Sequence, residues 1–494
     1  MTTHQGSKAS RTKEISATDH QEIEWQFDAG DLESVEGWLD QHTSGSSGLV
    51  VAPESTLEIT DTYYDTDDWR FYRAGYALRV RNTDGEIEAT MKSLTPAEGS
   101  LRRRREISEP LSDDKLATLR EAEGPVGGRS RTLVSGRELR PLFTLETRRQ
   151  RFALLLEGFD SGQEHVRSGE ISLDASEIPL GEEPARLTRV EVETGMAPSP
   201  DLPGLVDEMQ SVLELSPASA SKYETDLYAS GLNPQGDSEF GPTRIDPSMS
   251  LGEVAFAVLR AQFAEMRDHE PGTRLGEDPE ELHDMRVPTR RMRAAMKVFE
   301  GALPERASWL REELRWVAQA LGKVRDLDVQ IERFEAWRGE ADEEVSGFLD
   351  RILAITRKQR TEARKNMLET LDSARYERLM SSFAEMLRLG PAAELELAQA
   401  DEPVTATAPA LLSRRYRKWR RAAKRLDESS SSETFHDVRK KGKRLRYTLE
   451  AKDLRSVVPG SKPFRTLTKG KEWKKFEKDM ESRGEANTPN EDTR

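Results

Sequence analysis

The sequence predicts an α+β protein, with an antiparallel sheet or closed barrel of about eight strands in its N-terminal half and an all-helical bundle with an internal duplication in its C-terminal half. Short segments of alternating polar and apolar residues recur from 19 to 230, as is typical of strands. A stretch rich in Gly, Pro and Asp follows at 231–247 and predicts a linker. From 248 to 475 apolar residues recur every three or four positions, which predicts helices. We expect polar, disordered tails at 1–18 and 476–494.

The composition and the net charge exclude several classes of function. The 494 residues carry a net charge of -15 and include no cysteine, so disulfides and thiolate metal sites are excluded. The negative balance argues against nucleic acid as a partner. No apolar run approaches the roughly 20 residues that a membrane-spanning helix needs, and the first residues do not form a signal peptide. We therefore expect a soluble, cytoplasmic protein that does not bind membranes.

The predicted strands carry charges of both signs on one face and apolar residues on the other. Glu22-Ile23-Glu24 and Glu191-Val192-Glu193 place two acids on one face, and Arg79 and Arg81 also share a face. Acids two apart on a strand repel each other, and a divalent cation bound through oxygen ligands would explain their pairing. Paired arginines suit the phosphate groups that such a metal bridges. The same pattern fits an exposed charged sheet equally well.

A basic motif occurs twice in the helical half. The first copy, HDMRVPTRRMRAAMK, places its cations at steps of three and four along one helical face, and the second, HDVRKKGKRLR, repeats these steps. The residues in these two rows are His283, Arg286, Arg290, Arg293 and Lys297, and His436, Arg439, Lys443 and Arg446. Two such rows favour a polyanion lying between them, with a solvated basic face as the alternative. Pro288 predicts a kink or a late start in the first helix.

These motifs resemble two known families. The N-terminal half resembles the CYTH domain of the triphosphate tunnel metalloenzymes, in Glu22-Ile23-Glu24, in YYDTDDWRFYRAGYALRVR from Tyr63, in Thr90-Met91-Lys92, in Glu191-Val192-Glu193 and in Ser221-Lys222-Tyr223. The C-terminal half resembles the CHAD domain, in both basic motifs and in LGKVRDLDV from Leu321. The resemblance implies an eight-stranded tunnel that binds Mg or Mn and hydrolyses tripolyphosphate or a related triphosphate. It also implies a helical bundle that binds inorganic polyphosphate through the two basic rows, with an association with polyphosphate granules.

The resemblance also implies roles for single residues. The implied metal ligands are Glu22, Glu24, Glu191 and Glu193, and the implied catalytic residues are Glu22, Glu24 and Lys92. The implied phosphate contacts are Arg79, Arg81, Lys92, Arg103, Arg148 and Lys222.

The chain departs from these families at two places. The lysine of the ExExK signature is Gln26 here, and loss of a charged contact costs about 1.5 to 3 kcal/mol. Two functions therefore stay open: a metal-dependent triphosphatase, or a non-catalytic polyphosphate-binding or targeting module with a degenerate tunnel. After Leu467 the helix expected of a CHAD bundle looks truncated or replaced.

Overall fold

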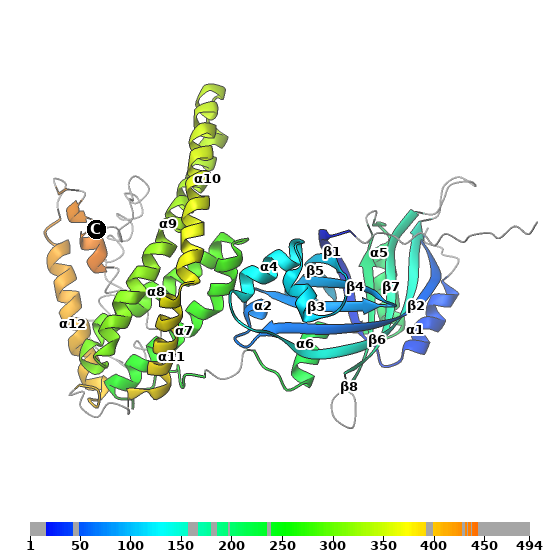
Figure 1. Ribbon diagram of the computed structural model, residues 1–494, viewed down its shortest axis with the longest axis horizontal. Coiled ribbons are helices and arrows are strands. Elements are labelled where there is room, and N and C mark those ends of the chain that lie inside the picture. The colour runs from blue at the N-terminus through cyan, green and yellow to red at the C-terminus, as the bar shows by residue number, and fades with distance from the viewer. Residues whose placement is uncertain are drawn as a thin grey trace, which may run out of the picture. The chain divides into compact units, whose positions relative to one another are not determined.

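The computed structural model describes residues 16–42, 49–156, 166–178, 185–195, 198–234, 239–391, 399–426, 430–431, 433–435 and 437–442. The chain divides into two compact units, residues 1–235 and 236–494 (Figure 1). No helix in the described ranges is long and apolar enough to cross a membrane.

The first unit is a closed antiparallel barrel of eight strands, which confirms the predicted fold. The strands are β1 (Thr18–Asp28), β2 (Leu49–Thr66), β3 (Tyr76–Thr83), β4 (Glu86–Ser93), β5 (Leu101–Leu111), β6 (Leu139–Leu156), β7 (Val166–Ile178) and β8 (Ala185–Thr194). They follow the order β5-β4-β3-β2-β6-β7-β8-β1, and a second pairing of β1 with β5 closes the barrel. A two-residue strand, β9 (Ser216–Pro217), pairs with the end of β1.

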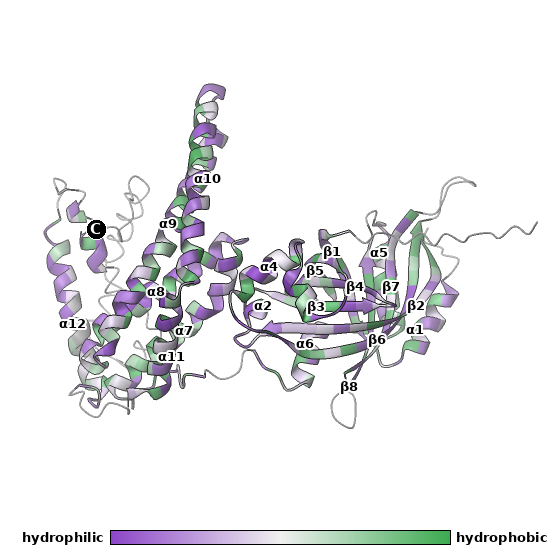
Figure 2. Cartoon of the chain, viewed as in Figure 1, coloured by the Kyte–Doolittle hydropathy of each residue, from purple (hydrophilic) through white to green (hydrophobic). Residues whose placement is uncertain are grey.

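Six helices accompany this barrel. They are α1 (Leu32–Gln41), α2 (Arg70–Arg73), α3 (Leu116–Glu121), α4 (Pro125–Val134), α5 (Leu202–Val212) and α6 (Lys222–Ala229). Helices α1 and α5 pack on its outer surface, whereas α6 packs against Tyr63 and Ala77, which line the interior. Trp38 of α1 and Leu205 of α5 share an apolar cluster with Phe27, Val190 and Val192 of the strands. Because successive side chains of a strand point to opposite faces, the alternate, charged residues of β1 and β8 face the barrel interior. Figure 2 shows this mixture of hydrophobic and hydrophilic positions along the strands.

The second unit is helical throughout its described residues. Its helices are α7 (Leu251–Leu275), α8 (Pro279–Val298), η1 (Glu300–Ala302), α9 (Arg306–Glu340), α10 (Glu343–Leu371), α11 (Ala374–Leu389) and α12 (Val404–Ala423). Ser250 and Glu253 form a capping box at the start of α7, and Gly276, with φ 67°, ends it in the left-handed conformation that glycine favours. One apolar core joins these helices, with Phe263, Met292 and Phe383 among its members.

The first basic motif lies on α8, and this helix runs unbroken through Pro288. The predicted late start is therefore wrong: Asp278 accepts from the Glu280 backbone N–H and the helix begins at Pro279. In the second motif, three of the four residues of the basic row, His436, Lys443 and Arg446, lie outside the described residues, whereas Arg439 is described and half-buried. Outside the described ranges also lie residues 1–15, the predicted tail at 476–494 and the segment after Leu467.

Candidate active site

The barrel encloses a cavity of about 130 Å³ that is lined mainly by charged side chains. They come from β1, β3, β4, β5, β6 and β8 and from the start of α6. The charged and amide groups are Glu22, Gln26, Arg79, Arg81, Lys92, Arg104, Glu106, Arg149, Glu191, Glu193 and Lys222. Strands β1 and β8 contribute acidic groups, whereas β3, β4 and β6 contribute cations, so the electrostatics of the cavity depend on how these groups pair.

Lys92 lies among acidic side chains on one side of the cavity. Its Nζ contacts Glu22 and lies 3.4 Å from Glu24 Oε1 and 3.5 Å from Glu106 Oε2. Burial opposes a charge on Lys92, but these carboxylates outweigh it and raise its pKa. Arg104 forms a further ion pair with Glu24, which is almost fully buried. Lys92 and Arg104 therefore neutralise much of the acidic side.

Two carboxylates on this side are poorly neutralised. Burial, together with repulsion from Glu24 and Glu106, raises the pKa of Glu22 to about 7 although Lys92 lowers it. Burial and the nearby Glu22 raise the pKa of Glu193 to about 8. Crowded, buried carboxylates of this kind are stabilised by a divalent cation, which takes oxygen ligands.

The donor chemistry therefore fits Mg or Mn. The side chains are not arranged as a finished metal site. Within the described ranges, no three acidic or histidine side chains converge on one point that could hold a metal ion. In this structure Lys92 lies among the same carboxylates.

Glu191 has different surroundings from Glu193, although both side chains line the cavity. Its Oε1 accepts from Gln26 Nε2 at 2.9 Å and lies 3.0 Å from Lys222 Nζ, and its Oε2 accepts from Arg149 Nη2 at 2.7 Å. Burial opposes its charge, but Lys222 and Arg149 outweigh burial and hold its pKa well below the usual range. The buried Asp174 accepts a second bond from Arg149 Nη2, also at 2.7 Å. Glu191 is thus a charged carboxylate held by cations and by the Gln26 amide.

Asp61 holds the two arginines of β3. Arg81 donates through Nε and Nη2 to the two oxygens of Asp61, each at 2.8 Å, and Arg79 Nη1 lies 3.7 Å from Asp61 Oδ2. The cavity volume of about 130 Å³ is well below the roughly 300–1,000 Å³ of ordinary ligand pockets. A triphosphate can therefore enter only if some ion pairs open, and the forked arginine donors suit its oxygens as well as they suit carboxylates.

In the helical unit, α8 presents its predicted basic row beside a buried apolar face. Leu282, Met285 and Met292 pack in the core, while the row itself is half-buried up to Arg293 and exposed at Lys297. Lys297 Nζ lies 2.7 Å from Glu300 Oε2. The row occupies one continuous helix, so its three-and-four spacing places the five side chains along one side.

Comparison with protein families separates the same two parts of the chain. The CYTH domain family matches residues 37–225, and the CHAD domain family matches residues 257–478. The chain is a CYTH domain followed by a CHAD domain. Both resemblances drawn from the sequence motifs are thereby confirmed.

Relatives of this CYTH–CHAD protein include Rv2226 and MT2285, two uncharacterized proteins of Mycobacterium tuberculosis. Each is 30% identical over 193 residues, which is 38% of this chain and 37% of the relative. The match thus spans well under half the length of these relatives.

Similar solved structures fall on both domains. The CHAD domain from the plant Ricinus communis is 23% identical with a TM-score of 0.40, covering 51% of this chain and 78% of its own. PptA from Streptomyces chartreusis is 22% identical with a TM-score of 0.35, covering 50% and 89%. HpAC1 from Hippeastrum, described as having a dominant triphosphatase activity, is 16% identical with a TM-score of 0.31, covering 44% and 100%.

The CYTH barrel brings most of the residues predicted from the motifs into one cavity. Glu22, Arg79, Arg81, Lys92, Glu191, Glu193 and Lys222 line it, and Glu24 lies behind Lys92 and Arg104. Arg103 and Arg148 do not reach it. Both are exposed, and Arg148 faces Glu58 across the outer surface.

The strand period explains both corrections. Arg103 shares its face of β5 with Ile107, and Arg148 shares its face of β6 with Phe152, which packs under the outer helices. The neighbouring Arg104 and Arg149 therefore point inward, together with Glu106. These three residues, with Asp61 and Asp174, were missed. Ile107 and Phe152, each four positions after the exposed arginine of its strand, were the signal that could have found the two inward-facing arginines.

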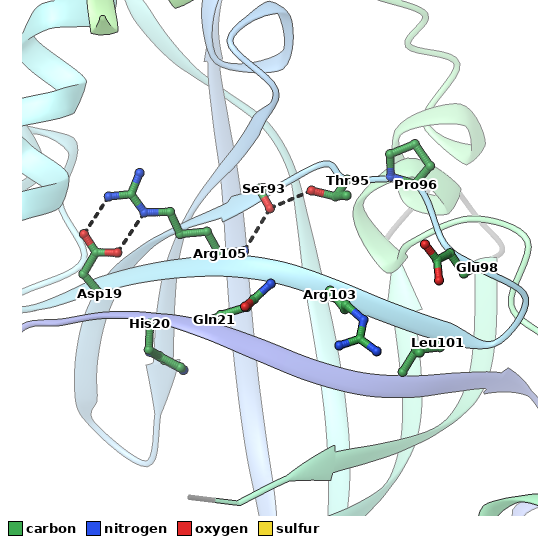
Figure 3. A pocket seen from close by; sticks show the side chains of 10 residues that line it. All are labelled: Asp19, His20, Gln21, Ser93, Thr95, Pro96, Glu98, Leu101, Arg103 and Arg105. Carbon is green, nitrogen blue, oxygen red and sulfur yellow. Dashed lines mark hydrogen bonds and ion pairs between the residues drawn. The ribbon is translucent and has the colours of Figure 1, made fainter. Parts of the chain in front are cut away.

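Arg103 instead lines a larger pocket of about 720 Å³ along β1, β5 and the loop after β4 (Figure 3). There Arg105 donates to both oxygens of Asp19 at 2.8 Å, and Ser93 Oγ accepts from the Arg105 backbone N–H. This pocket shares only Ser93 with the lining of the barrel cavity.

Proposed function

We propose that the CYTH barrel is a divalent-cation-dependent triphosphatase for tripolyphosphate or a related triphosphate, and that the CHAD bundle binds inorganic polyphosphate. One observation carries the first part: Arg79, Arg81, Lys92, Arg149 and Lys222 converge on one buried cavity that also holds the crowded carboxylates Glu22 and Glu193. Phosphoryl transfer requires cations that bind the phosphate oxygens, and it requires acidic groups that can bind a metal ion.

The ion pairs suggest which residues would bind phosphate and which would bind the metal. Arg81 and Arg149, now bound in forked geometry to Asp61 and Asp174, would exchange those carboxylates for phosphate oxygens. Glu22, Glu24 and Glu193 would hold Mg or Mn, which when bound neutralises charge on the transferring phosphoryl group. Lys92 would leave these acids and turn to the phosphate.

Glu191 was predicted as a fourth metal ligand. Its bonds to Arg149, Lys222 and Gln26 support a different role, in which it positions the cations that bind phosphate. Because its charge is already compensated, it has less to gain from a metal than Glu193 has.

Gln26 supports a second candidate, a barrel that binds triphosphate without hydrolysing it. Its amide occupies the position of the ExExK lysine and donates one hydrogen bond to Glu191 without supplying a positive charge. The barrel then has one cation fewer for the charge that develops during phosphoryl transfer, while Lys222 and Arg149 still suffice for binding.

The first experiment measures phosphate release from tripolyphosphate by the full chain with Mg and then with Mn. The Glu22→Ala/Glu24→Ala variant is compared with a Glu58→Ala control, since Glu58 lies exposed on the outer surface. Release that needs the metal and is lost only in the double variant supports the enzyme. Calorimetric binding of tripolyphosphate without release supports the binding barrel, and neither release nor binding overturns both.

For the CHAD bundle, the half-buried row on α8 supports polyphosphate as the ligand, because a flexible polyanion can follow cations spaced one helical turn apart. Under this proposal the protein acts in the cytoplasm, where it would associate with polyphosphate granules.

A further inference from the structure

Helix α10 carries an apolar stripe that nothing in the described part of its unit covers. Val345, Phe348 and Ile355 are 48%, 54% and 60% exposed, and Ile352 between them is half-buried. We call these four residues the α10 stripe; green bands mark hydrophobic residues along this helix in Figure 2. Their spacing of three, four and three places them on one side of the helix. Single exposed apolar residues are ordinary, but an aligned row marks an interaction surface.

The stripe is distinct from the face that α10 packs within its own chain. Leu349 and Leu353 are buried at 7% and 2% exposure, whereas the stripe lies on the adjoining side. In the apolar core of the helical unit, the last buried residue of α9 is Val324 and the first buried residue of α10 is Met367. The distal parts of α9 and α10 thus extend past the helices of their own unit (Figure 1).

We propose that a second copy of this chain covers the stripe, with the two α10 helices packed antiparallel about a twofold axis. Apolar residues at alternating steps of three and four form the seam of a two-helix coiled coil. Pairing about residue 350 sets Val345 opposite the partner's Ile355, and Phe348 opposite the partner's Ile352. One patch then meets itself, as a twofold interface requires.

The charges beside the stripe select the antiparallel orientation. Glu344 stands exposed at its N-terminal end and Lys358 stands exposed at its C-terminal end. In the described ranges these two side chains have no ion-pair partner. An antiparallel pair places Glu344 of each copy beside the partner's Lys358, whereas a parallel pair leaves Glu344 at the same end as the partner's Glu344.

The antiparallel arrangement also determines how tightly the two copies bind. Arg351, whose guanidinium lies 6.0 Å from the centroid of its own Phe348 ring, falls near the axis and meets the partner's Arg351. Four apolar positions per copy also bury less than the roughly 1,200–2,000 Å² of a stable complex. We therefore expect a weak dimer with a dissociation constant in the micromolar range.

The absence of cysteine from the chain makes a register-specific test possible. In the variant Val345→Cys/Ile355→Cys the two thiols of one chain are ten residues apart, about 15 Å along the helix. That separation is too long for a disulfide, which needs Cα atoms within about 7 Å. Only two chains in the proposed register can join them, so mild oxidation should convert most of the double variant into covalent dimer. The single variants Val345→Cys and Ile355→Cys should remain largely monomeric, and cross-linking that is no greater in the double variant overturns the register.

Sedimentation equilibrium of the full chain provides the second measurement. The native chain should show a concentration-dependent dimer, Phe348→Glu should be monomeric, and Val212→Glu, at an equally exposed position on α5, should still dimerise. Glu344→Lys should weaken the dimer at least fivefold, and adding Lys358→Glu should restore it. A native chain that is monomeric throughout overturns the proposal. If Phe348→Glu then lowers the unfolding temperature, the occupant is the chain's own segment beyond residue 442 instead.

Discussion

Arg148 and Arg149 follow each other in β6 but lie on opposite sides of the barrel wall. Arg149 is 15% exposed and its Nη2 lies 2.7 Å from both Asp174 and Glu191. Arg148 is 72% exposed and its Nε lies 4.0 Å from Glu58. The two residues have the same chemistry and nearly the same sequence position, so they form a matched pair for testing the cavity.

We expect Arg149→Gln to weaken tripolyphosphate binding and Arg148→Gln to leave it within twofold of the native value. Loss of a charged hydrogen bond costs about 1.5 to 3 kcal/mol, which is roughly a 10- to 150-fold rise in the dissociation constant. Calorimetric titration with tripolyphosphate measures it, and circular dichroism checks that the barrel remains folded. Equal effects at the two positions would place the ligand outside the barrel.

This pair also illustrates what the sequence could predict. The two-residue period of a strand separates its residues into two faces but does not say which face is inside. In β5 the run from Arg102 to Arg105 has basic residues on both faces, and the buried Ile107 further along the strand marks the outer one. Family motifs located Glu22, Lys92 and Lys222, whereas Glu106 and Asp174 belong to no motif that would mark them among the other acids of β5 and β7.

The ion pairs themselves depend on strand register and barrel closure. Neither follows from the two-residue period of a single strand. Glu24 lies opposite Glu193 across β1 and β8, while Lys92 reaches Glu22 from β4. The basic row of α8 could be predicted from the sequence, because it depends only on the local helical period.

Gln26→Lys should restore a cation at the inner wall of the barrel. Its amide already donates to Glu191 Oε1, so a lysine there would share that carboxylate with Lys222 and add positive charge beside the phosphate. We expect kcat/KM for tripolyphosphate to rise at least tenfold, equivalent to about 1.4 kcal/mol. Steady-state kinetics with Mg measure it, with Gln26→Met as the uncharged control. An equal change in both variants would mean that packing, not charge, limits the barrel.

Asp226 gives a prediction for stability against pH. It is fully buried on α6, and within the described ranges neither carboxylate oxygen has a hydrogen-bond partner. Burial raises its pKa to about 7 although Lys222 and Arg189 lower it. Since its folded pKa exceeds the unfolded value of about 3.9, its contribution to stability is fully present below pH 4. That contribution falls as pH rises to 7, by up to about 4 kcal/mol.

Asp226→Asn removes this titration. The variant should be more stable than the native chain at pH 8, and its advantage should shrink steadily toward pH 5. Urea unfolding at four pH values measures the difference, with Asp201→Asn as a control because Asp201 is exposed and its side chain makes no capping bond. An advantage that stays constant with pH would mean that Asp226 is not the titrating group.

The basic row of α8 gives the last prediction, for the CHAD bundle. Arg290→Glu changes two units of charge at the middle of the row, whereas Arg378→Glu makes the same change at an exposed position on α11. If polyphosphate follows the row, only the first variant should lose retention on immobilised polyphosphate, by at least tenfold at 0.05 M salt. The difference should narrow at 0.5 M salt, where the Debye length falls to a few Å. Because Arg290 is half-buried, thermal unfolding of both variants checks that the bundle survives. Equal losses in the two variants would indicate attraction to total charge instead of a site on α8, and no loss in either would remove α8 from the polyphosphate surface.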